Sequence, residues 1–199
     1  MKWFGFCLLI PAVLWCGSVV SNRLALRENL IRLHVVAASD SEEDQAVKLR
    51  VRDALISALE APMAGITDKV EARACLQEKL PELQSIAQRV LLNSGCEAPV
   101  LVSLTEEAFD TRVYDTFTLP AGVYDTLRVT IGEGEGRNWW CVVFPTLCLP
   151  ATSEGFEELA RTNGMDAALA CALSGEDGYE LRFYFLDLLG NLENMWYNG

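Results

Sequence analysis

The chain has 199 residues, of which 51% are hydrophobic and 22% charged, a balance that supports a folded core and argues against a disordered chain. Its formal net charge of −12 argues against a nucleic-acid-binding surface, which needs clustered Lys and Arg, and disfavours anionic membranes. A basic partner surface fits this charge, although the charge also serves solubility alone. We therefore expect a globular protein of one domain.

The N-terminal segment has the character of an export signal. A positive start is followed by an almost wholly apolar stretch over residues 3–15, which is typical of secretory signals. Small residues come next, so cleavage after Ser18 or Ser21 is one outcome. The apolar run is also close to the roughly 20 residues that span a bilayer, so an uncleaved anchor is the other. We predict a signal peptide or signal anchor over residues 1–21, and one domain over residues 28–199 that meets the membrane only through this segment.

The first strand and the first helix are predicted from adjoining patterns. Residues 30–38 alternate as a strand does, with Leu33 on one face and His34 on the other. Ser41, with Asp44 three residues on, forms a capping pattern that predicts a helix start. The helix is expected over residues 42–60, with Ala61-Pro62 as its stop.

A second helical region is predicted to begin at Asp68. Pro81 lies inside it and is expected to kink or divide it, because proline lacks the amide proton that a helix interior needs. Ser94 and Gly95 form a good C-terminal cap.

Three further strands are predicted, over residues 99–104, 123–131 and 138–144. The last two flank the glycine-rich turn at residues 132–137, so we expect them to pair antiparallel.

The C-terminal part carries weaker patterns. Helical periodicity recurs over residues 153–173, whereas residues 181–196 fit a helix or, at their start, a strand, with helix favoured. The fold class that we predict is α+β: a mixed or antiparallel sheet with helices packed on it, in a single domain after the export helix.

Few residues are suited to catalysis or to metal binding. His34 is the only histidine, which excludes sites with two imidazoles, and the sequence has no C-x-x-C zinc pattern. We therefore expect no metal, no cofactor and no enzyme activity. The alternative is a secreted hydrolase of cell-wall peptide or protein, with Cys141 as nucleophile and His34 as base. Cys141 and Cys148 also form a candidate disulfide, because a strand end and a turn could bring them together.

Two adjacent tryptophans suggest a contact surface. On a strand, Trp139 and Trp140 point to opposite faces, so one of them is available to a partner or lies under a loop unless both faces are covered. Tryptophan is also enriched at interface hot spots. The glutamates of residues 132–137 would repel a phosphate, so this turn is a poor nucleotide site.

Three blocks of sequence carry a specific resemblance. They are RLHVVAASDSEEDQ at residues 32–45, FTLPAG at residues 117–122 and GEGEGRNWWCVVFP at residues 132–145. In this order they resemble stage II sporulation protein R. One departure is Ala38, where the family more usually has Asn, so a capping hydrogen bond from this position is in doubt.

The resemblance implies a function that periodicity does not show. Members of the family are made in the forespore, exported into the space between the forespore and mother-cell membranes, and activate a membrane-embedded aspartic protease that processes a sigma-factor precursor. The chain would then be a ligand and the receptor protease its partner. The contact residues that we predict, from motif density and expected exposure, are His34, Asp40, Glu42, Glu133, Glu135, Asn138, Trp139 and Trp140.

Overall fold

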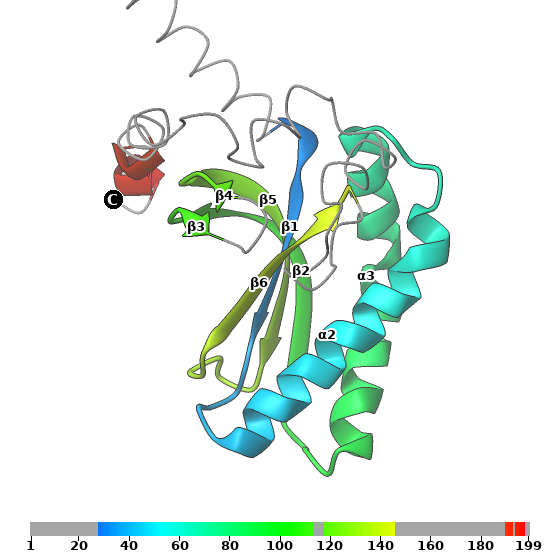
Figure 1. Cartoon of the computed structure of the whole chain (residues 1–199). Coiled ribbons are helices and arrows are strands. Elements are labelled where there is room, and N and C mark those ends of the chain that lie inside the picture. The colour runs from blue at the N-terminus through cyan, green and yellow to red at the C-terminus, as the bar shows by residue number, and fades with distance from the viewer. Residues whose placement is uncertain (1–27, 114–117, 146–189, 193, 198–199) are drawn as a thin grey trace, which may run out of the picture.

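The structure is a computed structural model that describes residues 28–113, 118–145, 190–192 and 194–197 (Figure 1). Its elements are the strand β1 (Ile31–Val36), the helices α2 (Glu42–Met63) and α3 (Lys69–Asn93), and the strands β2 (Val100–Phe109), β3 (Arg112–Val113), β4 (Thr118–Leu119), β5 (Gly122–Ile131) and β6 (Asn138–Phe144).

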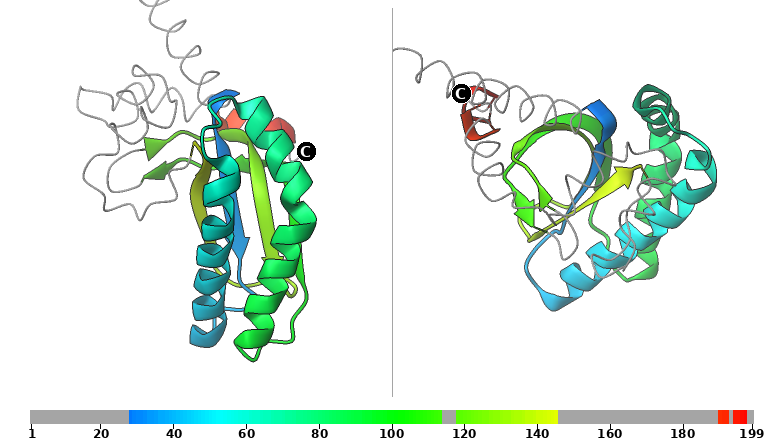
Figure 2. Two further views of the ribbon diagram at one scale, coloured as in Figure 1. Left: turned by 90° about the vertical axis from the view of Figure 1, so that its right-hand side faces the viewer. Right: turned by 45° about the horizontal axis from the view of Figure 1, so that its top comes forward.

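Four strands form one mixed sheet in the order β2-β5-β1-β6. β1 runs parallel to β5 and antiparallel to β6, and β2 runs antiparallel to β5. α2 and α3 lie side by side on one face of this sheet (Figures 1 and 2), and β3 and β4 form a separate small pair. The predicted α+β class, with helices packed on a mixed sheet, is confirmed.

Strand alternation builds the core as the sequence predicts. Leu33 and Val35 of β1 are fully buried on the helix face, together with Leu127 and Val129 of β5. The helices add apolar side chains at helical spacing to the same cluster. These are Val47, Val51, Leu55, Leu59 and Met63 of α2, and Ala72, Leu76, Leu83, Ala87 and Leu91 of α3.

The helix ends also follow the predicted side chains. Ser41 Oγ accepts a hydrogen bond from the Asp44 amide at the start of α2, and Asp68 does the same for Glu71 at the start of α3. Ser94 ends α3, and Gly95 follows with a φ of 75°, the left-handed conformation that glycine adopts without strain.

One pairing was predicted wrongly. β5 and β6 do not pair with each other, because β1 lies between them. All six residues of β1 are buried, which favours a central position over an edge. The turn at residues 132–137 therefore crosses the end of β1, a span of two strand spacings, or about 9.5 Å.

Both prolines are tolerated inside helices. α2 continues through Pro62 to Met63, so the predicted stop is wrong by a few residues, and Met63 is buried in the core. α3 is not divided at Pro81. Pro81 and Gln77, whose carbonyl loses its helical donor, are both exposed, so water can satisfy that oxygen while the opposite side of α3 stays packed.

Several predictions fall outside the described residues. They are the export segment at residues 1–21 and the helical pattern at residues 153–173, together with residues 181–189. Residues 190–192 and 194–197 are helical, as favoured for that stretch. Within the described ranges, no helix combines the length and the apolar character needed to cross a bilayer.

Candidate functional site

Two of the three motif blocks meet at one end of the sheet. The β1–α2 loop, residues 37–41, lies beside the β5–β6 turn, residues 132–137, at the bottom of Figure 1. The Gly136 amide donates to the Ala37 carbonyl at 3.0 Å, and the Arg137 amide donates to Asp40 Oδ1 at 2.7 Å. Segments almost a hundred residues apart in the sequence therefore form one structural unit.

Gly136 makes this close approach possible. A Cβ built on Gly136 would lie 2.2 Å from the carbonyl oxygen of Ser39 and 2.9 Å from Ala37 Cβ. Both distances are far shorter than the 3.5–4.0 Å of an ordinary carbon contact. Glycine is therefore required here by the space that is left. A glycine is also required at position 134, but for a different reason: the φ of Gly134 is 68°, in the left-handed region that favours glycine.

A buried lysine joins the same two segments. Lys48 of α2 is only 4% exposed. Its Nζ donates to Gln45 Oε1 at 2.6 Å and to the Arg137 carbonyl at 2.8 Å, and Gln45 Nε2 donates to the Ser39 carbonyl at 2.9 Å. Burial, followed by the nearby positive charge of Arg137, holds the pKa of Lys48 below its ordinary value.

Four acidic side chains surround this junction. Asp40, Glu42, Glu133 and Glu135 are all exposed, and we call them the acidic rim. Asp40 forms an ion pair with Arg137 at 3.5 Å, in which both side chains are mostly exposed. The rim therefore presents negative charge on a backbone that hydrogen bonds, those of the buried Lys48 and Gly136 among them, hold in place. The remaining block, at residues 117–122, differs in place, because its described residues lead into the start of β5 at Gly122 and so lie at the other end of that strand.

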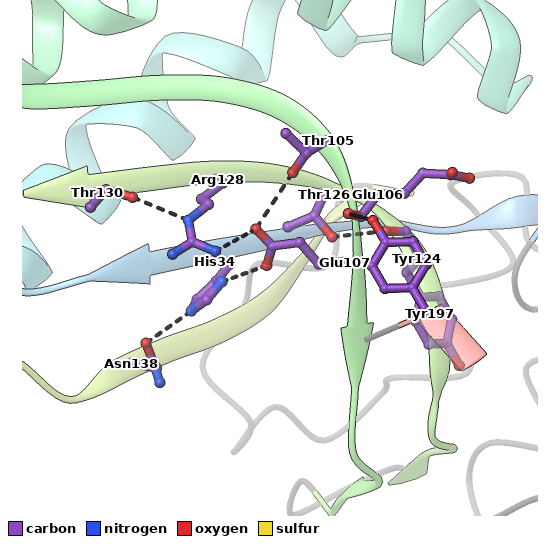
Figure 3. A network of polar contacts seen from close by, with 10 residues as sticks. All are labelled: His34, Thr105, Glu106, Glu107, Tyr124, Thr126, Arg128, Thr130, Asn138 and Tyr197. Atoms are coloured by element: carbon purple, nitrogen blue, oxygen red, sulfur yellow. Dashed lines mark hydrogen bonds and ion pairs between the residues drawn. The ribbon is translucent and has the colours of Figure 1, made fainter. Parts of the chain in front are cut away.

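A second cluster lies on the sheet face opposite the helices (Figure 3). His34 Nδ1 is 2.7 Å from Glu107 Oε2, and its Nε2 is 2.9 Å from Asn138 Oδ1. Arg128 donates to the other oxygen of Glu107 at 3.0 Å. The cluster thus links all four strands of the sheet, since these residues come from β1, β2, β5 and β6.

The electrostatics of Glu107 fit a structural role for this network. Burial alone would raise the pKa of Glu107, but hydrogen bonds and charge from His34 and Arg128 lower it below its ordinary value. The carboxylate is therefore the favoured form. The same face of the sheet also contains the buried Arg32. The Arg32 guanidinium lies over the Phe109 ring, 3.8 Å from its centroid.

The two tryptophans do point to opposite faces. Trp139 lies on the helix side under Arg52 of α2, with the guanidinium carbon 4.3 Å from the ring centroid. Trp140 stacks on His34 at 5.7 Å on the other side, and the Arg112 guanidinium covers it at 3.7 Å. Both rings are half-buried. They contribute to internal packing, and the exposed positions of the predicted set are Asn138 and the acidic rim.

The alternative nucleophile and base are not brought together. Cys141 is opposite Leu33 in the strand register and lies in the core under the helices, whereas His34 lies on the other face. This pair cannot act as a catalytic dyad. Cys141 is disulfide-bonded, and Cys75 and Cys96 are free thiols. Its partner therefore lies outside the described residues, and the pairing with Cys148 stays a prediction.

No metal site is visible in the described part of the chain. The residues there contain no group of three or more His, Cys, Asp or Glu side chains placed to hold an ion. That the chain uses neither metal nor cofactor stays a prediction.

Sequence reasoning missed Glu107 and Arg128. Each is a charged residue at an alternating position of a strand, which places it on the polar face with His34. Alternation alone could have assigned Arg128 to that face, but the strand predicted over residues 99–104 stopped short of Glu107, whereas β2 extends to Phe109. Alternation could not have shown that they meet His34, because Glu107 is 73 residues away from it in the sequence.

Comparison with known proteins agrees with the motif blocks. The model of the stage II sporulation protein R family matches residues 27–154. Stage II sporulation protein R of Bacillus subtilis (strain 168) is 36% identical over 132 residues, which cover 66% of this chain and 59% of that protein. No solved structure matches the chain. The matched region contains the whole four-stranded sheet, both long helices and the acidic rim. On these grounds the chain belongs to the stage II sporulation protein R family.

Proposed function

We propose that this chain is an exported signalling protein of sporulation that activates a membrane-embedded aspartic protease, and thereby the processing of a sigma-factor precursor in the mother cell. Membership of the family supports a role in sporulation. The finer activity and the location between the forespore and mother-cell membranes follow from what the resemblance implies. In this proposal the chain is the ligand and the receptor protease breaks the peptide bond.

The observation that carries the proposal is the acidic rim. Two motif blocks from distant parts of the sequence are held together by a hydrogen bond between the buried residues Gly136 and Ala37 and by an exposed one between Arg137 and Asp40, and their acidic side chains remain exposed. A structural role in the described part of the fold does not explain why Glu133 and Glu135 are acidic and exposed. A prearranged patch of net negative charge, four acidic side chains against Arg137, suits a protein partner with a basic surface, since complementary charges steer association.

Activation places a thermodynamic demand on such a ligand. It must bind the active state of the receptor more tightly than the inactive state. A preference of about 1.4 kcal/mol shifts that equilibrium tenfold. The structure does not support the hydrolase alternative, because Cys141 and His34 lie on opposite faces of the sheet.

The proposal is tested by co-expression in a host that lacks sporulation genes. The chain, a candidate receptor protease and its sigma-factor precursor are expressed together and in each pairwise combination. We expect processed sigma factor only when all three are present. Processing by the protease without this chain would contradict the proposal.

A charge-reversal variant locates the contact. Glu133→Lys with Glu135→Lys changes the rim, and Glu60→Lys with Glu78→Lys makes an equal charge change at exposed helix positions. We expect at least a tenfold loss of processing for the rim variant and little change for the control. Equal effects of both variants would show that net charge matters and the rim does not.

A further inference from the structure

Lys48 is an unusual buried cation. Lysine is almost never buried unless it is paired, and Lys48 is only 4% exposed. Its two hydrogen-bond partners are neutral oxygens, those of the Gln45 side chain and the Arg137 backbone. The nearby charges that act on it include two like charges, Arg137 and Arg52, and one opposite charge, the exposed Asp40.

This arrangement has a cost for the fold. A cation that leaves water without a carboxylate beside it loses solvation that neutral acceptors replace only in part. A hydrophobic side chain of similar length at the same position would avoid that loss. Global stability is therefore a poor explanation for lysine at this position.

The position of Lys48 offers a better explanation. Its Nζ binds the carbonyl of Arg137 at the end of the β5–β6 turn. Through Gln45 it is also connected to the Ser39 carbonyl in the β1–α2 loop. A single ammonium group thus joins helix α2 to both backbone segments that bear the acidic rim.

We infer that Lys48 is a positioning residue, which fixes the β5–β6 turn against the start of α2 so that the acidic rim is presented to the receptor in one arrangement. The receptor part of this inference rests on the proposed function, whereas the positioning part does not. Lys48 itself is buried and does not touch the partner.

Hydrogen exchange tests the positioning directly. The chain is purified after export from an expression host, and amide exchange is followed residue by residue in wild type and in Lys48→Met. The amides of Gly136 and Arg137 are the reporters, because both donate across the junction. Loss of a hydrogen bond from a charged donor corresponds to roughly a tenfold change in an opening equilibrium. We therefore expect these two amides to exchange about tenfold faster.

Strand β1 serves as a reference, which distinguishes local loosening of the turn from a general loss of structure. Leu33 in β1 lies at the centre of the sheet, and its amide should exchange as in wild type. The urea midpoint should stay within about 0.3 M of the wild-type value, with an unchanged m-value. Lys48→Arg, which keeps charge and donors, should restore much of the protection. Lys79→Met, at a more exposed position of α3, serves as the matched control and should change neither reporter.

Each contrary result would overturn one part of the inference about Lys48. Unchanged exchange at Gly136 and Arg137 in Lys48→Met would show that the turn does not depend on this lysine. Faster exchange throughout β1 and β5, with a lower urea midpoint, would make Lys48 a general stabiliser. A loosened turn with wild-type sigma-factor processing would refute the link to the receptor. If wild type itself fails to activate any protease, the proposed function fails, while the exchange data still decide the positioning.

Discussion

Replacing Gly136 with alanine should separate the two loops that support the acidic rim. The added Cβ would lie 2.2 Å from the oxygen and 2.6 Å from the carbon of the Ser39 carbonyl. These are backbone atoms, so rotation of a side chain cannot relieve the contact. The turn must move away by about 1 Å to reach ordinary van der Waals distance.

That movement breaks identifiable bonds. The bond from the Gly136 amide to Ala37 is 3.0 Å long, and a lengthening of about 1 Å leaves no hydrogen bond. The neighbouring bond from Arg137 to the Asp40 carboxylate, at 2.7 Å, is strained as well. A neutral bond contributes about 1 kcal/mol and a bond to a charged group about 2 kcal/mol. After the smaller entropy of the unfolded alanine chain is allowed for, we expect Gly136→Ala to lower the free energy of unfolding by about 2 kcal/mol.

Urea unfolding at 25 °C, followed by circular dichroism, measures this change. Gly65→Ala is the control, because a Cβ there meets nothing within 4 Å and the φ of 81° alone is unfavourable. Its cost should be near 1 kcal/mol. The reasoning is refuted if Gly136→Ala unfolds at the wild-type urea midpoint, or if it costs no more than Gly65→Ala.

Four further substitutions test the Glu107 network, the ion pairs that Asp125 of β5 forms with Lys69 and Arg73 of α3, and the start of α2. Glu107→Gln should cost about 2 kcal/mol at pH 7, because it removes the charge that binds His34 and Arg128. Since the folded pKa of Glu107 is lowered, this difference should be complete above about pH 4.3, the unfolded value, and should vanish as the pH falls through the folded pKa; a difference that grows in acid would contradict the assignment. Asp125→Asn should cost about 1 kcal/mol of unfolding free energy at neutral pH, because it removes the charge that pairs with Lys69 and Arg73. Burial would raise the pKa of Asp125, but these two cations lower it, so the cost should shrink in acid as it does for Glu107→Gln. Urea titrations at pH 7 and pH 3 check this. Ser41→Ala should cost about 1 kcal/mol through loss of the cap of α2, whereas Ser41→Asp should retain most of the stability.

The sequence predicted the parts of the fold that depend on local patterns. The alternation in β1, the caps at Ser41 and Asp68 and the glycine that ends α3 all appear as expected. Each of these features is decided by side chains within a few residues of one another. The bounds of β6 were also predicted to the residue.

Features that depend on the whole sheet were not predicted. The insertion of β1 between β5 and β6 follows from the burial of β1 on both sides, which no local pattern reveals. Pro81 is accommodated in α3 because the buried side of the helix holds it on the sheet. In both cases tertiary packing overrides a local preference.

The candidate site shows the same division. Exposure of the acidic rim was expected, because two of its members lie at a helix start and two in a glycine-rich turn, and the structure places all four acids at the surface. The role of Trp140 could not be predicted, because its neighbours His34 and Arg112 come from β1 and β3. A lysine on a helix is normally expected to face solvent, yet Lys48 is buried under a turn that lies 89 residues away in the sequence.

Recognition between the acidic rim and a receptor protease is the central claim. The most direct measurement adds the exported, purified chain to membrane vesicles that contain the protease and the sigma-factor precursor, and follows the appearance of processed sigma factor. The account predicts processing that depends on the added chain, weakens at high salt, and falls at least tenfold with Glu133→Lys and Glu135→Lys but not with Glu60→Lys and Glu78→Lys. Processing that is equally strong with the rim variant, or that proceeds without the chain, would contradict it.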